Sequence, residues 1–470
     1  MGRREELGGG RGVSERDPRV AVVGGGLAGL SAALACADGG ARVTLLEARP
    51  RLGGATFSFR REGLWVDNGQ HVFLRCCTAY RGFLERIGAT GRTFLQDRLA
   101  IPVLAPDGRT GWLRRTRLPA PLHLAGALAR YPFLPPRDRI RAAAAALALT
   151  RLQPGPDLDA RTFGGWLAER RQSPAAVAAL WNLIALPTLN LPAGEASLAL
   201  AVKVFRTGLL DGRAAGDVGY ATGPLSEVHG EPAARALSAA GVEVRTRGAV
   251  RAIRPTPSGG TAAPRFDVVL EDGRVEADAV ILAVPHDAAP AILPSGSVPG
   301  MERWTALGAS PIVNVHVVYD RRVTGHAFAA GVDSAVQWVF DRTGPSGLDH
   351  GQYLAVSLSG ADREIAERTE DIRATFLPAL GALFPRARDA RVESFFVTRE
   401  HAATFRQAPG TAALRPGPAT RLPGLALAGA WTDTGWPVTM ESAVRSGLAA
   451  ARETLVASGL GDRLAVGAAA

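Results

Sequence analysis

The chain has almost no lysine. Lys203 is the only one, and the other 53 of its 54 basic residues are arginines spread along the sequence. A nucleic-acid-binding surface needs basic residues that cluster in a run or on one face. The formal net charge of +10 therefore does not predict binding to DNA or RNA. We expect no nucleic-acid partner.

Cysteines and long apolar runs are also scarce. Cys36, Cys76 and Cys77 are the only cysteines, and they form neither a disulfide framework nor a CxxC pair, so we expect a reducing, cytoplasmic setting. No stretch reaches the roughly 18 apolar residues of a spanning helix, which limits any membrane contact to peripheral binding at the inner face. Residues 1–18 are charged and glycine-rich without the apolar core of a signal peptide, and we expect a disordered leader.

What the chain does contain, near its start, is the pattern of a dinucleotide-binding unit. The apolar run VAVV at 20–23 precedes GGGLAG and a segment with helical spacing, and a second apolar run ends on Glu47. Gly24, Gly26 and Gly29 thus form G-x-G-x-x-G between an expected strand and an expected helix. These glycines permit the turn and the close approach of a pyrophosphate to the helix N-terminus. Glu47 is then placed to accept hydrogen bonds from a ribose.

A second glycine pair distinguishes FAD from a nicotinamide cofactor. Gly53 and Gly54 follow the ribose acid closely, and a nicotinamide Rossmann domain has no use for them. Here the chain resembles the flavin amine oxidase and phytoene desaturase superfamily, in which an arginine and Gly-Gly run along the FAD diphosphate. In that pattern an arginine usually follows the glycine pair. Ala55 stands there instead, which leaves Arg51 as the candidate for phosphate contact.

The C-terminal part resembles the last FAD segment of the same superfamily. Residues 425–428 read as a strand, followed by a glycine-containing loop and a helix from about Met440. In the superfamily the strand ends in Ala-Gly-Asp, and the helix N-terminus caps the flavin ring. Ala430 replaces the acid, so Asp433 is the alternative contact. No cysteine lies in this segment to tether a flavin, which implies non-covalent FAD. The resemblance implies FAD contacts at Gly429, Trp431, Asp433, Met440 and Glu441.

A third FAD segment lies between the first two. Residues 223–253 read as helix, strand and turn, and the strand ending near Val250 resembles the adenine-contacting strand of the superfamily. The expected fold class is α/β, with a Rossmann-like FAD-binding domain assembled from separated segments and an α+β substrate domain. The FAD-binding domain is expected to comprise residues 19–75, 219–289 and 413–460, and the substrate domain residues 76–218 and 290–412.

The polar stretch LWVDNGQHVFLRCCTAY at 64–80 admits several interpretations. Its adjacent cysteines cannot easily turn toward one tetrahedral zinc, and a fourth ligand is missing nearby, so no metal is expected. A cysteine nucleophile would need a base and helix-end activation, and a flavin makes one unnecessary. In the superfamily this stretch passes the isoalloxazine ring, which implies cofactor contacts at Asn68 and Gly69. His71 is either an acid or base at the reacting centre or a hydrogen-bonded structural residue.

The substrate class follows from what surrounds these motifs. Amine oxidases usually carry a lysine soon after the ILAVP strand, whereas Lys203 precedes that strand, so a cationic substrate is disfavoured. Residues 119–153 alternate apolar runs with arginines and prolines. They fit short helices at a membrane interface and equally fit core packing in the substrate domain. Residues 163–205 are apolar and helical, as expected for the wall of a long tunnel.

The segments DNGQH, LWNLIALPTLNLPAGEASLALAV and AGAWTDTGWPVTMESAVRSG carry a finer resemblance, to the squalene-associated flavin desaturase-like family, the hydroxysqualene dehydroxylases. The resemblance covers residues 19–455. It implies reductive removal of the allylic hydroxyl of hydroxysqualene to give squalene for hopanoid synthesis. A hydride passes from N5 of reduced flavin to an allylic cation-like centre, and the flavin needs an electron donor. The candidate proton donors are His71 first and Asp67 second.

Two alternatives stay open at this stage. An oxidative desaturase of a phytoene-like isoprenoid would use the same fold, and no residue in the sequence sets the direction of the chemistry. A non-catalytic protein of the flavin fold would be expected to carry damaged FAD segments, whereas all three segments are intact here.

Overall fold

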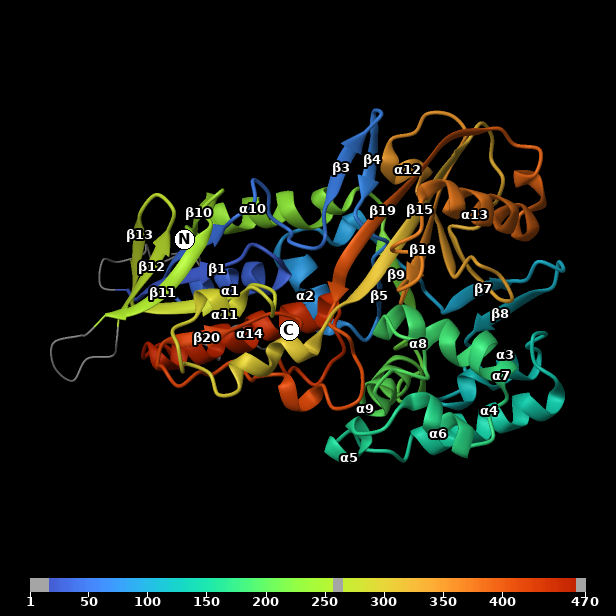
Figure 1. The fold of residues 1–470 in the computed structure, drawn as a ribbon, viewed down its shortest axis with the longest axis horizontal. Helices are drawn as coiled ribbons and strands as arrows, with labels where there is room; N and C mark the ends of the chain where they lie inside the picture. The colour runs from blue at the N-terminus through green and yellow to red at the C-terminus, as the bar shows by residue number, and fades with distance from the viewer. Residues whose placement is uncertain (1–16, 257–264, 462–470) are drawn as a thin grey trace, which may run out of the picture.

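The computed structural model describes residues 17–256 and 265–461. A parallel sheet with its helices forms one end of the molecule, and a mixed sheet with its helices forms the other (Figure 1). The predicted leader, residues 1–18, lies outside the described residues except for its last two. The predicted fold class is confirmed.

The parallel sheet has five strands in the order β10-β2-β1-β14-β20. Its strands come from widely separated stretches: β1 (Arg19–Val23), β2 (Arg42–Glu47), β10 (Glu243–Thr246), β14 (Ala279–Leu282) and β20 (Leu425–Leu427). The strands are short apolar runs because both faces of the sheet are covered. In β1, Val20 and Val22 pack toward the helices, while Ala21 and Val23 pack toward the opposite face.

Helices α1 (Leu27–Asp38) and α14 (Met440–Ala457) cover one face of this sheet and touch each other closely. A Cβ built on Gly447 of α14 would lie 2.1 Å from the Ala28 carbonyl oxygen and 2.2 Å from the Ser31 hydroxyl of α1. Only a glycine at that position lets the two backbones approach this far. Helices α2 (Thr78–Arg86) and α10 (Glu231–Ala239) complete the layer.

The other face carries an antiparallel sheet of β11 (Val250–Thr256), β12 (Arg265–Leu270) and β13 (Arg274–Ala277). The prediction that the preceding strand runs on to near Val250 is wrong. That strand, β10, ends at Thr246, because Arg247 adopts a left-handed conformation (φ 60°) and the chain turns there. Val250 therefore opens a strand of a different sheet.

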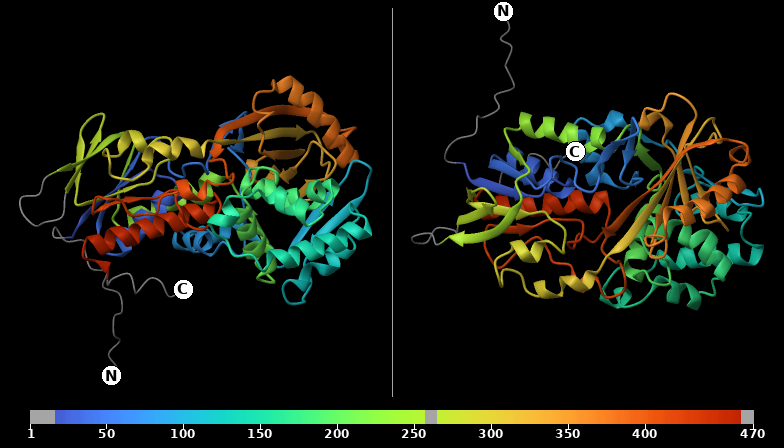
Figure 2. Two further views of the ribbon diagram at one scale, coloured as in Figure 1. Left: turned by 60° about the horizontal axis from the view of Figure 1, so that its bottom comes forward. Right: turned by 45° about the horizontal axis from the view of Figure 1, so that its top comes forward.

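The mixed sheet has the order β19-β15-β18-β17-β16-β7-β8, and only the β16–β7 pair is parallel. Its strands are β7 (Ala100–Leu104), β8 (Thr110–Arg114), β15 (Ser310–Tyr319), β16 (Phe328–Gly331), β17 (Trp338–Asp341), β18 (Gln352–Ser359) and β19 (Val392–Thr404). Helix α13 (Thr369–Leu383) covers one face. The other face packs on α4 (Pro136–Leu149), α6 (Phe163–Glu169), α8 (Asn182–Leu189) and α9 (Leu198–Phe205) (Figure 2).

Two small sheets lie between the large ones (Figure 1). They are the hairpin β3 (Ser58–Arg61) and β4 (Leu64–Asp67), and the sheet of β5 (Val72–Leu74), β9 (Val218–Ala221) and β6 (Thr93–Leu95). The remaining α-helices are short: α3 (Ala125–Ala129), α5 (Pro156–Asp159), α7 (Pro174–Ala176), α11 (Ala289–Ile292) and α12 (Thr343–Ser346). Within residues 17–256 and 265–461, none of the helices combines the length and apolar character needed to span a bilayer. The predicted domain bounds stay a prediction.

The close contact of α1 with α14 predicts opposite effects for two Gly→Ala substitutions. Gly447→Ala should destabilise the fold by about 1–3 kcal/mol, because the new methyl group overlaps α1. Gly82→Ala in α2 has open space around its Cβ and should stabilise by about 0.5–1 kcal/mol through helix propensity. Urea unfolding of both variants tests this, and equal effects would contradict the close packing.

Candidate functional site

The first glycine motif forms a tight loop at the end of β1. Gly24 has φ 110°, and a Cβ on it would lie 2.4 Å from the Ala283 carbonyl oxygen; a Cβ on Gly29 would lie 1.8 Å from the Gly24 carbonyl oxygen. These two glycines are required by the protein's own packing. A Cβ on Gly26 would meet only the Cα of Gly54, at 3.7 Å, so space remains in front of Gly26.

The N-terminus of α1 opens into that space. Gly26 is its N-cap residue, and within the described chain no side chain caps the helix and its first turn holds no acid. The first N–H groups of a helix need partners, and the helix dipole favours an anion there. A diphosphate supplies both requirements. The residues present therefore fit the diphosphate of FAD.

Glu47 lies at the carboxyl end of β2, beside the glycine loop. Its buried carboxylate accepts hydrogen bonds from the backbone N–H of Gly25 at 2.6 Å and of Arg49 at 2.7 Å. Its own carbonyl accepts one from the N–H of Gly248 at 3.0 Å, in the turn that leads to Val250. The segment that leads to Val250 therefore lies beside Glu47. The ribose contact predicted for Glu47 and the adenine contact predicted for Val250 stay predictions.

The second glycine pair touches the first loop. Gly53 and Gly54 have φ values of 103° and 57°, and a Cβ on Gly54 would lie 2.7 Å from the Cα of Gly26. Arg51 donates to the carbonyl oxygen of Gly54 at 3.0 Å and lies over the Phe57 ring at 3.4 Å. The predicted phosphate ligand Arg51 is thus fixed beside the loop.

The C-terminal loop depends on an arginine that the sequence did not single out. Arg415 is buried, and its guanidinium donates to the carbonyl oxygens of Trp431 (3.2 Å), Thr432 (2.6 Å) and Trp436 (2.9 Å). These bonds fix the loop after β20, where Gly429 has φ 142°. No local motif marks Arg415, because it is one arginine among 53.

Helix α14 begins at Met440, as predicted, and Thr439 caps it by accepting from the Ser442 N–H at 3.2 Å. The Glu441 carboxylate is buried, and Arg445 of the same helix donates to it at 2.7 Å. It accepts from the N–H groups of Ala79 (3.2 Å) and Tyr80 (2.8 Å) at the start of α2. Only the backbone of Glu441 is thus left for the predicted cofactor contact.

The two remaining predicted residues of the C-terminal loop also have partners in the protein. Trp431 donates through its indole to the Val284 carbonyl oxygen at 2.9 Å. The Asp433 carboxylate is exposed and accepts from the Gly435 N–H at 3.1 Å. A contact of Asp433 with the ribityl and phosphate region stays a prediction.

Asp67, the second candidate proton donor, lies in a buried ion pair. Its carboxylate is 2.5 Å from the Arg342 guanidinium and also accepts from the Ser58 hydroxyl at 2.6 Å and the Leu225 N–H at 3.0 Å. A carboxylate with three donors around it acts as an acceptor. We therefore replace the predicted proton-donor role of Asp67 by a positioning role.

His71 and Asn314 both approach Gly69. A Cβ on Gly69 would be 3.6 Å from His71 Nε2 and 3.8 Å from Asn314 Nδ2. The Asn314 amide donates to the Asn68 carbonyl oxygen at 3.2 Å, which fixes its orientation. Its Oδ1 is then an acceptor, buried and without a partner among the described residues. Sequence reasoning missed Asn314, because it lies inside an apolar strand.

His71 also differs from the fully buried histidines. His229 is bonded to the Tyr80 hydroxyl at 2.7 Å, and His316 lies between the hydroxyls of Tyr353 and Thr398. Burial lowers the pKa of both to about 3. The His71 imidazole has no hydrogen-bond partner within the described chain. The pKa of His71 is lowered, mainly by burial. The negative charge of Asp67 acts in the opposite direction, and the positive charge of Arg342 lowers the pKa further.

The lysine that the sequence argument set aside lies beside the C-terminal loop. Lys203 on α9 stands over the Trp436 ring at 4.7 Å, and Arg445 lies over the same ring at 4.9 Å. Cys76 and Cys77 are free thiols, half-buried at the start of α2. No group of three or more metal-binding side chains occurs in the part of the chain that the structure describes.

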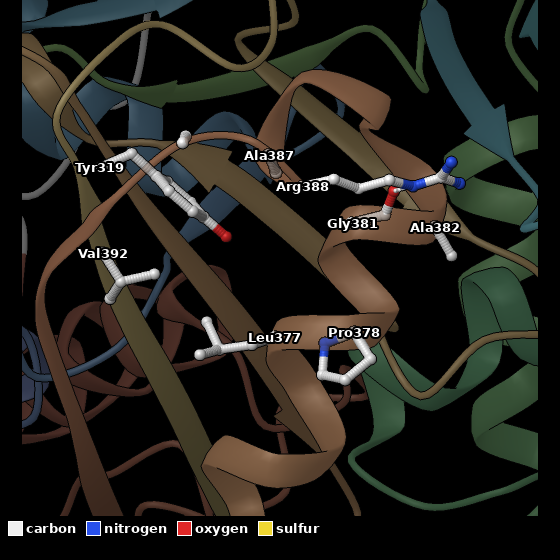
Figure 3. A pocket seen from close by; sticks show the side chains of 9 residues that line it. Tyr319, Leu377, Pro378, Gly381, Ala382, Ala387, Arg388 and Val392 are labelled. Carbon is white, nitrogen blue, oxygen red and sulfur yellow. Dashed lines mark hydrogen bonds between the residues drawn. The ribbon is translucent and has the colours of Figure 1, made fainter.

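A cavity of about 500 Å³ lies between α13 and the mixed sheet, away from all predicted site residues. Figure 3 shows the Tyr319 ring pointing into it, toward the turn of α13 that contains Gly381. Its lining is otherwise mostly apolar. It is separate from the candidate site.

The family model for flavin-containing amine oxidoreductases matches residues 27–455. The chain belongs to this family. Membership makes it a flavin-dependent oxidoreductase, in agreement with the glycine loops described above.

Relatives of this family differ in their reactions. The chain is 32% identical to a hydroxysqualene dehydroxylase of Rhodopseudomonas palustris, over 93% of this chain and 98% of that protein. It is 26% identical to a zeta-carotene desaturase of Synechocystis, over 93% and 97%. Among solved structures, putrescine oxidase bound to putrescine matches with a TM-score of 0.71 at 22% identity, over 94% and 99%. That last match shows the fold alone.

The buried ion pair predicts a large stability loss for Arg342→Met. The substitution leaves the Asp67 carboxylate buried without its partner, which should destabilise the fold by about 3–5 kcal/mol. Arg321→Met, which removes an exposed pair with Asp320, should leave the unfolding midpoint unchanged. Thermal unfolding measures both. Equal midpoints for the two variants would contradict the role given to the buried pair, and a double Arg342→Met, Asp67→Asn variant should recover part of the loss.

Proposed function

We propose that the protein reductively removes the allylic hydroxyl of hydroxysqualene to give squalene. The observation that carries the proposal is the 32% identity to a hydroxysqualene dehydroxylase along almost the full length of both chains. Further relatives with that name are 27% and 30% identical. The site adds support, because His71 and the Asn314 amide oxygen provide polar groups that a hydroxyl would satisfy.

FAD is the cofactor of the proposed reaction. The loop of Gly24, Gly26 and Gly29 and the start of α1 would hold its diphosphate, with Glu47 at the ribose and the start of α14 at the flavin. When bound and reduced, the flavin supplies a hydride. Each turnover consumes two electrons, so an external electron donor must restore the reduced cofactor.

The protein's own residues act on the hydroxyl. In the proposed mechanism the Asn314 Oδ1 accepts a hydrogen bond from the hydroxyl and orients it, and protonated His71 donates its proton to the departing oxygen. The C–O bond breaks and the oxygen leaves as water; the allylic carbon would then take up the hydride that bound, reduced flavin would supply. The ion pair of Asp67 and Arg342 positions the segment that carries His71.

An anaerobic single turnover tests the reaction. The holoenzyme is reduced chemically and mixed with hydroxysqualene, and flavin absorbance is followed together with squalene formation. We expect reoxidation with one squalene formed per flavin. If the reduced flavin persists, the proposed function is wrong. Bleaching of the oxidised enzyme by phytoene or a partly desaturated carotene would then establish the oxidative alternative.

The role of His71 predicts a specific pH dependence. Burial holds the pKa of His71 below its usual value of 6.5, so the protonated donor forms only as the pH falls. The single-turnover rate should therefore rise as the pH falls through 6.5 and below. His71→Gln should lower the rate about 10²–10⁴-fold and remove this pH dependence. His350→Gln, an exposed control, should change neither, and a His71→Gln enzyme with the wild-type profile would exclude His71 as donor.

A further inference from the structure

Large apolar side chains on the surface are concentrated in one stretch of the chain, residues 112–147. Nine large apolar residues are exposed in the described chain, and five of them lie between residues 112 and 147. These five are Trp112, Leu118, Leu122, Ile140 and Leu147. Trp112 of β8 points to the face of the mixed sheet opposite α4, because its neighbours Gly111 and Leu113 face the α4 side. The other four belong to the loop after β8, the 3-10 turn before α3, and α4, which lie together at the end of the molecule far from the parallel sheet (Figures 1 and 2).

Helix α4 presents two apolar faces. Its inner face, with Ala142, Ala145 and Leu149, packs in the core beside the mixed sheet. Its outer face exposes Ile140 (72%) and Leu147 (49%), two helical turns apart. Core packing therefore accounts for the inner face and leaves the outer one unexplained.

Arginines surround these apolar side chains. Seven arginines between residues 109 and 151 are exposed: Arg109, Arg114, Arg117, Arg130, Arg137, Arg141 and Arg151. The single acid in that range, Asp138, is buried in the first turn of α4. Within the described residues, Arg114, Arg117, Arg130 and Arg151 have no acidic partner within 4 Å. On α4, a spacing of three places Arg137 on the same outer face as Ile140 and Leu147.

We propose that this surface, Leu118, Leu122, Ile140 and Leu147 with the surrounding exposed arginines, docks onto an anionic lipid bilayer. Apolar side chains that enter the interface, together with arginines that face lipid headgroups, are the composition of an interfacial binding face. Each arginine near an anionic membrane adds to the binding, and salt weakens that part. The proposal does not depend on which isoprenoid the enzyme uses.

Vesicle co-sedimentation of the full-length holoenzyme tests the docking. Vesicles of phosphatidylcholine with 30% phosphatidylglycerol (about the anionic fraction needed for a strong surface potential) are compared with phosphatidylcholine alone, at low and high salt. We expect binding to the anionic vesicles that weakens with salt. Ile140→Asp with Leu147→Asp should reduce the partition coefficient about tenfold or more.

The matched control lies on another exposed helix face. Leu448 and Val456 on α14 are exposed by 44% and 58%, and Leu448→Asp with Val456→Asp adds the same charge. This control should bind vesicles like the wild type, and flavin absorbance and the unfolding midpoint should show that both variants are folded. Equal loss in both double variants would overturn the proposal. A second result would also overturn it. The wild type would be a dimer in solution, and the Ile140→Asp, Leu147→Asp variant would be a monomer that binds vesicles as the wild type does.

Discussion

The arrangement of the candidate site depends on one buried ion pair, between Asp67 and Arg342. Arg342 follows β17 of the mixed sheet, and its guanidinium also donates to the carbonyl oxygens of Ala221 at 3.0 Å and Gly223 at 3.2 Å. Asp67 ends β4 and also holds the Leu225 N–H. Three stretches far apart in the sequence, residues 58–67, residues 221–225 and Arg342, therefore meet at a single contact. Desolvating two charges is costly, so the pair specifies geometry more than it adds stability.

That contact determines where the following residues can lie. The chain leaves Asp67 directly into Asn68, whose amide group donates to the Ala55 carbonyl oxygen and accepts from the Phe57 N–H. The same Asn68 accepts from Asn314 on β15 through its own carbonyl oxygen. The segment that follows the second glycine pair and strand β15 of the mixed sheet are thus joined through Asn68, three residues before His71.

The sequence could predict the features that depend on neighbouring residues. The glycine loop, Glu47 and the start of α14 are local patterns, each set by a strand that runs into a turn and a helix. Arg342, Arg415 and Asn314 could not be found this way. Their partners lie far along the chain, 275 positions away for Asp67 and Arg342, and an arginine-rich composition hides a buried arginine among exposed ones. The strand ending at Thr246 was misjudged because one left-handed residue turns the chain.

In the proposed reaction, the polar groups around Gly69 would make the product bind more weakly than the substrate. A buried acceptor without a partner costs about 1–3 kcal/mol, and a hydroxyl held by Asn314 and His71 removes that cost. Squalene has no hydroxyl, so its presence leaves both groups unpaired again. Sites that hydrogen-bond a substrate hydroxyl discriminate strongly against the analogue that lacks it. The same two side chains would thus favour the alcohol over the hydrocarbon that it becomes, and the otherwise apolar product would be held by its chain alone.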